Sequence, residues 1–333
     1  MKKYLLYLLG GIGLVLIVLY SDWKAVWTYT KSISIEMFLL ALILQLLTII
    51  LITIQWKFMI LWIDKECSFI NVFRVNMKGN FVDAITPGVK MGGELARAYE
   101  IHNRLKLNLS EAAVVVGLQK TVSLLSFLFL TVISLVWFFI NMENQHKVYF
   151  NVFFIGVLIL TLSLLALILV CIKPNFVKKI LSKLPFNIKI KNKLEKFFKE
   201  YNLALNKLLI KKDKFLYQML LGMFIWLLFA FKMGLVVKGF NIKIGFISIA
   251  AITYLTYIVG MIPLLPGSIG SFESTMVSLL AIKGVPIEQG IAISVIFRFI
   301  TFWFEFWISL IVLSIDRLIV NFIKGGKYAG GKT

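Results

Sequence analysis

Acidic and basic residues recur in one arrangement at two places in this chain. Two segments begin with Pro-Gly, contain a further glycine and end, seven residues after the proline, in Glu94 and in Glu273. A helix is predicted after each segment, and each of these helices carries a basic residue in apolar sequence, Lys120 in the first and Arg298 in the second. Ionisable side chains within membrane helices usually face the bundle interior and mark a path for ions or substrates.

The Pro-Gly steps predict interrupted helices at about 80–105 and at about 263–284. Each backbone N–H or C=O group that is left without a hydrogen bond in lipid costs several kcal/mol, so such a break must lie in packed protein or beside a water-filled cavity. The N-terminus of the following helix has free N–H groups and about half a positive charge, which attract anions such as phosphate. The backbone positions expected to form the breaks are Pro87, Gly88, Gly92, Gly93, Pro266, Gly267 and Gly270.

Each of these features also has a simpler explanation. Pro-Gly is an ordinary turn dipeptide, and a glutamate in a first helical turn complements the helix dipole without binding a ligand. The recurrence of one spacing in two places favours a functional site, because duplicated, interrupted helices mark the binding sites of many transporters.

Arg298 and Glu305 both lie in one strongly apolar stretch. In a regular helix they fall within about 20° of one face and about 10 Å apart along the axis. They cannot pair directly at that separation, so each needs another partner. Glu94 and Glu273 are the natural partners for Arg298 and Lys120. Ion pairs that only lock helices together are the alternative interpretation.

The elements that must position these residues are apolar helices. Hydrophobic residues make up 60% of the 333 residues, above the roughly 45–50% of ordinary soluble domains. A spanning helix needs about 20 mostly apolar residues, whereas the strands of a membrane barrel alternate apolar and polar residues. The predicted spans are Tyr4–Tyr20, Met37–Trp56, Ala112–Ile140, Phe150–Ile172, Phe215–Val237, Ile244–Ile262 and Ile287–Ile315, with Gly267–Lys283 as a shorter further candidate.

The distribution of charge predicts the topology. Residues 173–214 contain 13 lysines and 3 acids, half of the net charge of +20. Basic loops between spans stay on the cytoplasmic side, so the N-terminus and this loop are expected there, beside anionic inner-leaflet lipids. An amphipathic helix in the loop is expected to lie on the leaflet rather than to form a specific partner site. The basic segment 317–333 is expected to be a flexible cytoplasmic tail, which requires one further crossing, best supplied by Gly267–Lys283.

Several classes of function are not supported. Nucleic-acid binding would need stacking aromatic residues on a folded platform, and Cys67 and Cys171 form no disulfide framework. His102 and His146 lie in no Cys/His cluster of the kind that binds zinc. The C-terminal Gly-Lys-Thr run matches a phosphate-binding loop on paper but lacks the strand and helix that such a loop requires. With no nucleophile–base pair either, we expect no catalytic residue, metal or cofactor.

A family resemblance rests on residues in both halves. These residues are Asn80, Pro87-Gly88, Gly93-Glu94-Leu95-Ala96-Arg97, Pro263, Pro266-Gly267-Ser268-Ile269-Gly270, Glu273, Ala292 and Arg298. Together they resemble the flippase-like transmembrane domain of lysylphosphatidylglycerol synthases, which also occurs alone in many bacterial and archaeal membrane proteins. The membrane part of some archaeal dolichyl-phosphate glycosyltransferases is similar.

The resemblance implies that the chain moves a lipid between leaflets, as the domain is held to do with an aminoacylated phospholipid. Two departures limit what is implied. No aminoacyl-transferase domain is present, so the chain is not expected to make the lipid. Lys120 stands where the family commonly has arginine, and lysine cannot grip a phosphate through two parallel hydrogen bonds.

We therefore predict an all-α, polytopic transmembrane bundle of about 7–8 spans. Its two pseudo-repeated halves are residues 1–172 and 215–316, each with a broken or re-entrant helix. The predicted function is translocation of a phospholipid or polyprenyl-linked lipid headgroup across the cell membrane. The alternatives are a secondary transporter or channel for a small solute and a non-catalytic partner of an envelope-lipid enzyme. The candidate headgroup-binding residues are Glu94, Arg97, Lys120, Glu273, Arg298 and Glu305.

Overall fold

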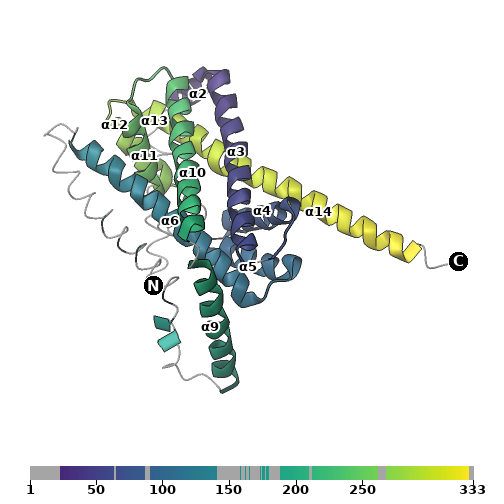
Figure 1. The fold of residues 1–333 in the computed structure, drawn as a ribbon. Helices are drawn as coiled ribbons and strands as arrows, with labels where there is room; N and C mark the ends of the chain where they lie inside the picture. Colours follow the sequence, from purple (N-terminus) through teal and green to yellow (C-terminus); the bar gives the residue numbers. More distant parts are fainter. Residues whose placement is uncertain are drawn as a thin grey trace.

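The computed structural model describes residues 23–63, 65–86, 91–140, 188–209, 212–261 and 268–329, with isolated positions between 158 and 179. Within these residues the fold is entirely helical (Figure 1). Several predicted features lie outside the described part. They are the span Tyr4–Tyr20, almost all of the span Phe150–Ile172, and the residues Pro87, Gly88, Pro266 and Gly267.

In the described part of the chain, four helical stretches are long and apolar enough to cross a bilayer. They lie in α3 (Ile35–Leu61), in α6 (Leu109–Ile140), in α10 (Lys212–Gly239) and in the nearly continuous run of α13 (Ile287–Arg298), η3 (Phe299–Trp303) and α14 (Phe304–Ala329). These are four of the predicted spans. Continuous apolar sequence over 27 or more residues reaches about 40 Å as a helix, enough to cross a hydrocarbon core of about 30 Å.

Two helical hairpins stand between these long helices, and each contains one of the predicted breaks. In the first, α4 (Phe69–Ile85) packs against α5 (Met91–Leu105). In the second, α11 (Phe246–Gly260) packs against α12 (Ser271–Ala281).

The second hairpin lies where a span was predicted at Ile244–Ile262 and a shorter candidate crossing at Gly267–Lys283. The helices found there have 15 and 11 residues, which reach only about 22 and 16 Å. Neither is long enough to cross the membrane by itself. Apolar composition suggested a full span only at Ile244–Ile262, and the two short helices pack against each other.

The ends of the long helices define two ends of the bundle. The Ser34 N–H, just before α3, donates to the carbonyl of Gly239 at the end of α10, at 3.0 Å. The short helix α2 (Trp23–Ser32) packs against α13 at this same end. The last turn of α3 and the first turn of α6 lie at the opposite end, where their side chains share one core with α9 (Ile188–Leu209).

The helix α9 is amphipathic as predicted, but its apolar face is covered by protein. Phe198, Tyr201 and Leu205 are only 7%, 8% and 4% exposed, because α9 packs against α6. The Ser110 hydroxyl of α6 also donates to a carboxylate oxygen of Glu200 at 2.7 Å. The expectation that this face lies on the lipid leaflet is therefore wrong.

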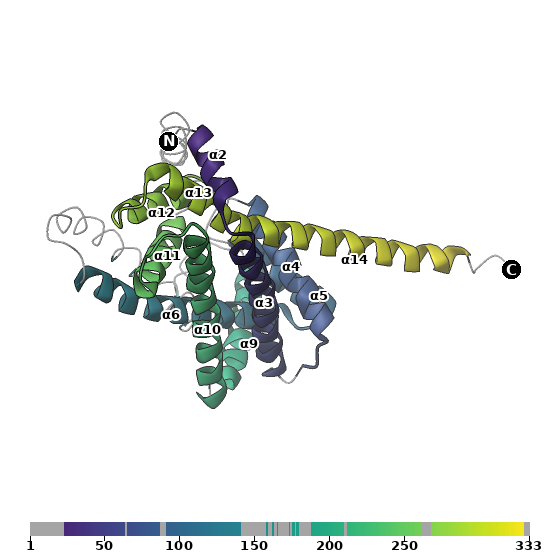
Figure 2. The ribbon, with the colours of Figure 1, turned by 90° about the horizontal axis from the view of Figure 1, so that it is seen from above.

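The last helix, α14, extends away from the other helices (Figures 1 and 2). It continues to Ala329, so residues 317–329, which were expected to be a flexible tail, are helical. Before it leaves the bundle, Asp316 pairs with Arg74 of α4 at 3.1 Å and with Arg104 of α5 at 2.6 Å. These ion pairs hold α14 against the first hairpin.

Candidate functional site

The helices α4 and α5, on either side of the first predicted break, pack closely against each other. One carboxylate oxygen of Asp83, near the end of α4, accepts from the Gly93 N–H in the first turn of α5 at 2.9 Å. A Cβ on Gly93 would overlap this carboxylate, and a Cβ on Gly79 would overlap the Arg97 side chain. An acidic or a basic side chain thus passes directly over the backbone at each glycine, and a Cβ at either position would force that side chain to shift.

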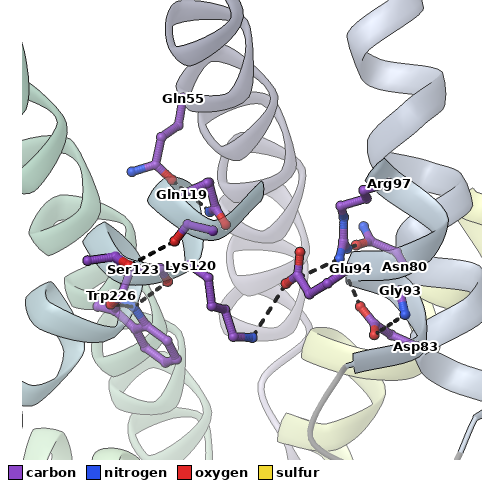
Figure 3. Close-up of polar contacts among 12 residues, drawn as sticks. Gln55, Asn80, Asp83, Gly93, Glu94, Arg97, Gln119, Lys120, Ser123 and Trp226 are labelled. Carbon is purple, nitrogen blue, oxygen red and sulfur yellow. Dashed lines mark hydrogen bonds and ion pairs between the residues drawn. The ribbon is translucent and has the colours of Figure 1, made fainter. Parts of the chain in front are cut away.

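Arg97 lies at the centre of a buried polar cluster between the hairpin and α6 (Figure 3). Its guanidinium pairs with Asp83 at 3.1 Å and with Glu94 at 3.5 Å, and it donates to the amide oxygen of Asn80. Glu94 lies between Arg97 and Lys120, whose ammonium is 3.4 Å from the same Glu94 oxygen. The structure thus brings together three predicted site residues, Glu94, Arg97 and Lys120.

Glu305 joins this cluster from α14. One of its carboxylate oxygens accepts from the side-chain amide of Asn80, and the other accepts from the side-chain amide of Gln45 at 3.4 Å. The Gln45 amide oxygen in turn accepts from the ammonium of Lys232 on α10. A line of polar contacts therefore runs from α10 through α3, α14 and α4 to α5.

Arg298 and Glu273 form a second pair in the other half of the chain. The Nε of Arg298 lies 3.6 Å from a Glu273 oxygen. The guanidinium carbon also lies 4.5 Å from the ring centroid of Phe272 and 4.8 Å from that of Phe302. Cation–π contacts of this kind are worth about 0.5–2 kcal/mol each. Nε and Nη2 of Arg298 are buried without a hydrogen-bond partner in the described part of the chain.

A π-helical turn, η3, separates Arg298 from Glu305. Such a turn accommodates one extra residue, which rotates the following residues by about 100° around the axis. The predicted shared face is therefore lost, and the two residues face different partners. The expectation that each would need a partner elsewhere is confirmed, with Glu273 next to Arg298 and with Asn80 and Gln45 next to Glu305.

Carboxylates already occupy the two helix N-termini that were expected to attract an anion. Asp83 accepts from the N–H of Gly93 at the start of α5. Glu273 accepts from the N–H of Gly270 at 2.6 Å, just before α12, where Gly270 has a φ of 89°. A phosphate would meet negative charge at both N-termini, so the basic side chains are the better candidates for binding it.

Sequence reasoning missed several members of the site. Lys232 is fully buried, and its ammonium also contacts the Thr48 hydroxyl at 3.1 Å and lies 3.8 Å from the ring centroid of Phe229. It was visible in the sequence as a lone cation within a predicted span. Gln45 and Gly79 gave no comparable signal, since single amides and glycines are common in membrane helices. Among the described residues, no group of three or more His, Cys, Asp and Glu side chains is placed to hold a metal ion.

Comparison with known proteins places this architecture in a family. Residues 5–309 match the family described as the lysylphosphatidylglycerol synthase TM region. A UPF0104 membrane protein of Pyrococcus horikoshii is 24% identical over 338 aligned positions, covering 96% of this chain and 99% of that protein. One of Methanothermobacter thermautotrophicus is 20% identical over 80% of this chain and 81% of its own length. One of Methanocaldococcus jannaschii is 26% identical, over 42% of each chain.

The family match covers nearly the whole chain, and the helical spans and buried charges agree with a membrane protein. The chain therefore belongs to the family of the lysylphosphatidylglycerol synthase transmembrane region.

Proposed function

We propose that this protein moves the headgroup of a phospholipid or of a polyprenyl-phosphate lipid between the leaflets of the cell membrane. In this proposal the headgroup passes through the bundle while the acyl or prenyl chains stay in the bilayer. The protein performs no covalent chemistry and needs no cofactor. Its family is named after the membrane region of an enzyme that makes a lipid, which supports a role in lipid handling.

The observation that carries the proposal is the environment of Arg298. Its side chain is 9% exposed and inside an apolar span, yet two of its guanidinium nitrogens have no hydrogen-bond partner in the described residues. Buried charged donors left in this state need an explanation. Aromatic faces and one carboxylate at 3.6 Å hold the cation in place. The remaining N–H groups suit the oxygens of a phosphate, which arginine can bind through two parallel hydrogen bonds.

The pair formed by Lys120 and Glu94 supplies a second site of the same design. In each half a glutamate in the first turn after an interrupted helix holds a cation from the following helix. This parallel supports two related halves, each with one headgroup-binding cation. Lys120 and Glu94 are 21% and 18% exposed, so a headgroup can approach them with little rearrangement. The glutamates keep the cations in place or bind a headgroup amine.

We further propose that the N-terminus and residues 173–214 lie in the cytoplasm. The lysines Lys191, Lys193, Lys196 and Lys199 of α9 are exposed, whereas its apolar face is buried against α6. Anionic lipids of the inner leaflet would then be attracted by the positive charge of these lysines and not by insertion of apolar side chains. This attraction is worth about 1 kcal/mol for each lysine near the membrane surface.

Reconstitution tests the proposed function directly. The protein is placed in vesicles of phosphatidylglycerol and phosphatidylethanolamine that contain a trace of fluorescent phosphatidylglycerol. A reagent that quenches only the probe in the outer leaflet then measures how fast the probe exchanges between leaflets. Loss of hydrogen bonds from a charged group costs about 1.5–3 kcal/mol, so Arg298→Ala should slow exchange by about 10- to 150-fold. Glu273→Gln should slow it less, because Arg298 keeps its aromatic contacts.

The exposed Glu36 in the first turn of α3 provides a matched control, and Glu36→Gln should behave as wild type. Equal exchange in wild type, in Arg298→Ala and in protein-free vesicles would remove the proposal. A labelled polyprenyl phosphate in the same vesicles distinguishes the two lipid classes. Uptake of a soluble solute without lipid exchange would instead support a secondary transporter.

A further inference from the structure

The polar face of α9 carries a hollow that the proposed function does not use. Its volume is about 630 Å³, and the described residues that line it comprise four asparagines, three lysines, one glutamate and two apolar side chains. The helix extends from one end of the bundle (Figure 1) and buries its apolar face against α6. Pockets for small molecules have volumes of about 300–1,000 Å³ and are mostly apolar. A hollow of this size lined by amides and charges therefore suits a strongly polar ligand.

Two contacts hold a preceding segment against α9 beside the hollow. The side-chain amide of Asn202 donates to the amide oxygen of Asn175 at 2.9 Å, and the ammonium of Lys178 lies 3.5 Å from a carboxylate oxygen of Glu195. Glu195 and Asn202 are seven residues apart, which is about 10 Å along a helix. All four residues line the hollow, so it is framed at two levels along α9, and Glu195 already offsets the charge of Lys178.

The two other lysines of the hollow, Lys196 and Lys199, are exposed. Neither pairs with a carboxylate in the part of the chain that the structure describes. Residues three apart on a helix are neighbours, and like charges at such a spacing repel each other. An anion bound between the two ammonium groups would remove this repulsion and accept hydrogen bonds from both of them.

The asparagines supply a second kind of contact. Asn192 and Asn206 line the hollow and are exposed, and no hydrogen bond to another described residue occupies their amides. An amide both donates and accepts, so it suits hydroxyl groups, whereas an ammonium suits the oxygens of a phosphate. Lys191 and Lys193 lie on the same helix but do not line the hollow, and they provide internal controls.

We propose that this hollow binds a hydroxyl-bearing phosphomonoester, with Lys196 and Lys199 on its phosphate and the asparagine amides on its hydroxyl groups. Three lysines and one glutamate give the lining a formal charge of +2, and a phosphomonoester carries about −1.5 to −2 at pH 7. A soluble glycerol phosphate or sugar phosphate has this chemistry, and so does a lipid headgroup that ends in a phosphorylated inositol. The hollow shares no residue with the buried cations of the bundle, so this inference goes beyond the proposed function and does not depend on it.

The reactivity of the lysines tests the site in the full-length protein, held in nanodiscs of phosphatidylcholine. An amine-acetylating reagent is applied with and without glycerol 3-phosphate, and mass spectrometry measures each lysine. At a ligand concentration about ten times Kd, acetylation of Lys196 and Lys199 should slow about tenfold, whereas Lys191 and Lys193 should keep their rates. Equal slowing of all four lysines, or the same slowing by sulfate at equal concentration, would overturn the proposal.

Charge-matched double variants separate a site from general attraction of anions to a basic helix. Loss of a charge-assisted hydrogen bond weakens binding by about 10- to 150-fold, so Lys196→Gln combined with Lys199→Gln should weaken binding of glycerol 3-phosphate, measured by calorimetry, by about tenfold or more. Lys191→Gln combined with Lys193→Gln removes the same charge and should leave the affinity unchanged. All four lysines are exposed, so α9 should stay folded in both variants, as size exclusion would show. Equal weakening in the two double variants would refute the site.

Two further measurements identify the ligand. Asn192→Ala should weaken binding of glycerol 3-phosphate more than binding of inorganic phosphate, and equal weakening of both would refute the role of the amide. Nanodiscs that contain phosphatidylinositol 4-phosphate, without soluble ligand, test the lipid source. Protection of Lys196 and Lys199 in these nanodiscs would identify a headgroup, and protection by glycerol 3-phosphate alone would identify a soluble ligand. No protection in either case would overturn the proposal, whereas a failure of lipid exchange in vesicles would leave it standing.

Discussion

Gly93→Ala is a small change that should destabilise the protein strongly. The added Cβ would overlap the carboxylate of Asp83, which is held in place by the Gly93 N–H at 2.9 Å and by Arg97 at 3.1 Å. Asp83 and Arg97 are 8% and 7% exposed. To make room, Asp83 must turn away from its cation.

The size of the effect follows from two opposing contributions. Breaking a buried ion pair costs about 3–5 kcal/mol, whereas replacing glycine by alanine in a helix gains about 1 kcal/mol. The net loss in the free energy of unfolding is then about 2–4 kcal/mol. At about 2–4 °C per kcal/mol, the midpoint of thermal unfolding should fall by roughly 5–15 °C.

Heating in detergent followed by fluorescence-detected size exclusion measures the midpoint. Gly234→Ala in α10 is the matched control, because in the described part of the chain no atom beyond its chain neighbours and its own helix backbone lies within 4 Å of the added Cβ, and it should be neutral or slightly stabilising. Asp83→Ala should lower the midpoint at least as much as Gly93→Ala, and the double variant should be no worse than Asp83→Ala alone, because both changes remove one interaction. A Gly93→Ala protein as stable as wild type would refute the reasoning.

Three further predictions concern other parts of the molecule. Lys232→Met should lower the free energy of unfolding by about 1–3 kcal/mol, because it leaves a buried amide oxygen without its donor, whereas Lys238→Met at the exposed end of the same helix should change it little; equal effects would contradict the buried role. Phe272→Leu removes one of the two aromatic rings that contact Arg298. The loss of this cation–π contact should lower the free energy of unfolding by about 0.5–2 kcal/mol, as measured by thermal unfolding at neutral pH. Burial raises the pKa of the Cys67 thiol above its ordinary value, so in a variant whose other cysteine is serine, maleimide labelling should accelerate with rising pH up to that raised pKa. Cys67 packs against the core that α9 shares, so in the proposed topology labelling should come only from the cytoplasmic side, and equal labelling from both sides would contradict that topology.

The sequence alone was enough to predict the helical membrane character of the chain and the approximate positions of four spans. Apolar runs of this length have few alternatives, because a chain in lipid must pair its own backbone groups. The sequence also predicted that two glutamates would lie near buried cations. Glu94 and Glu273 are acids near buried cations, and an unpaired cation in an apolar helix is costly enough that a partner must exist.

Only the tertiary structure decided how these residues are combined. The π-helical turn at η3 changed the face on which Glu305 lies, and helical periodicity cannot reveal one extra residue in a turn. The chain positions of Gln45, Asn80 and Lys232 did not indicate that they would meet at Glu305, because amide–carboxylate contacts between distant helices depend on how the helices pack. The same reason explains α9, whose amphipathic pattern predicted an apolar face but not whether lipid or protein would cover it.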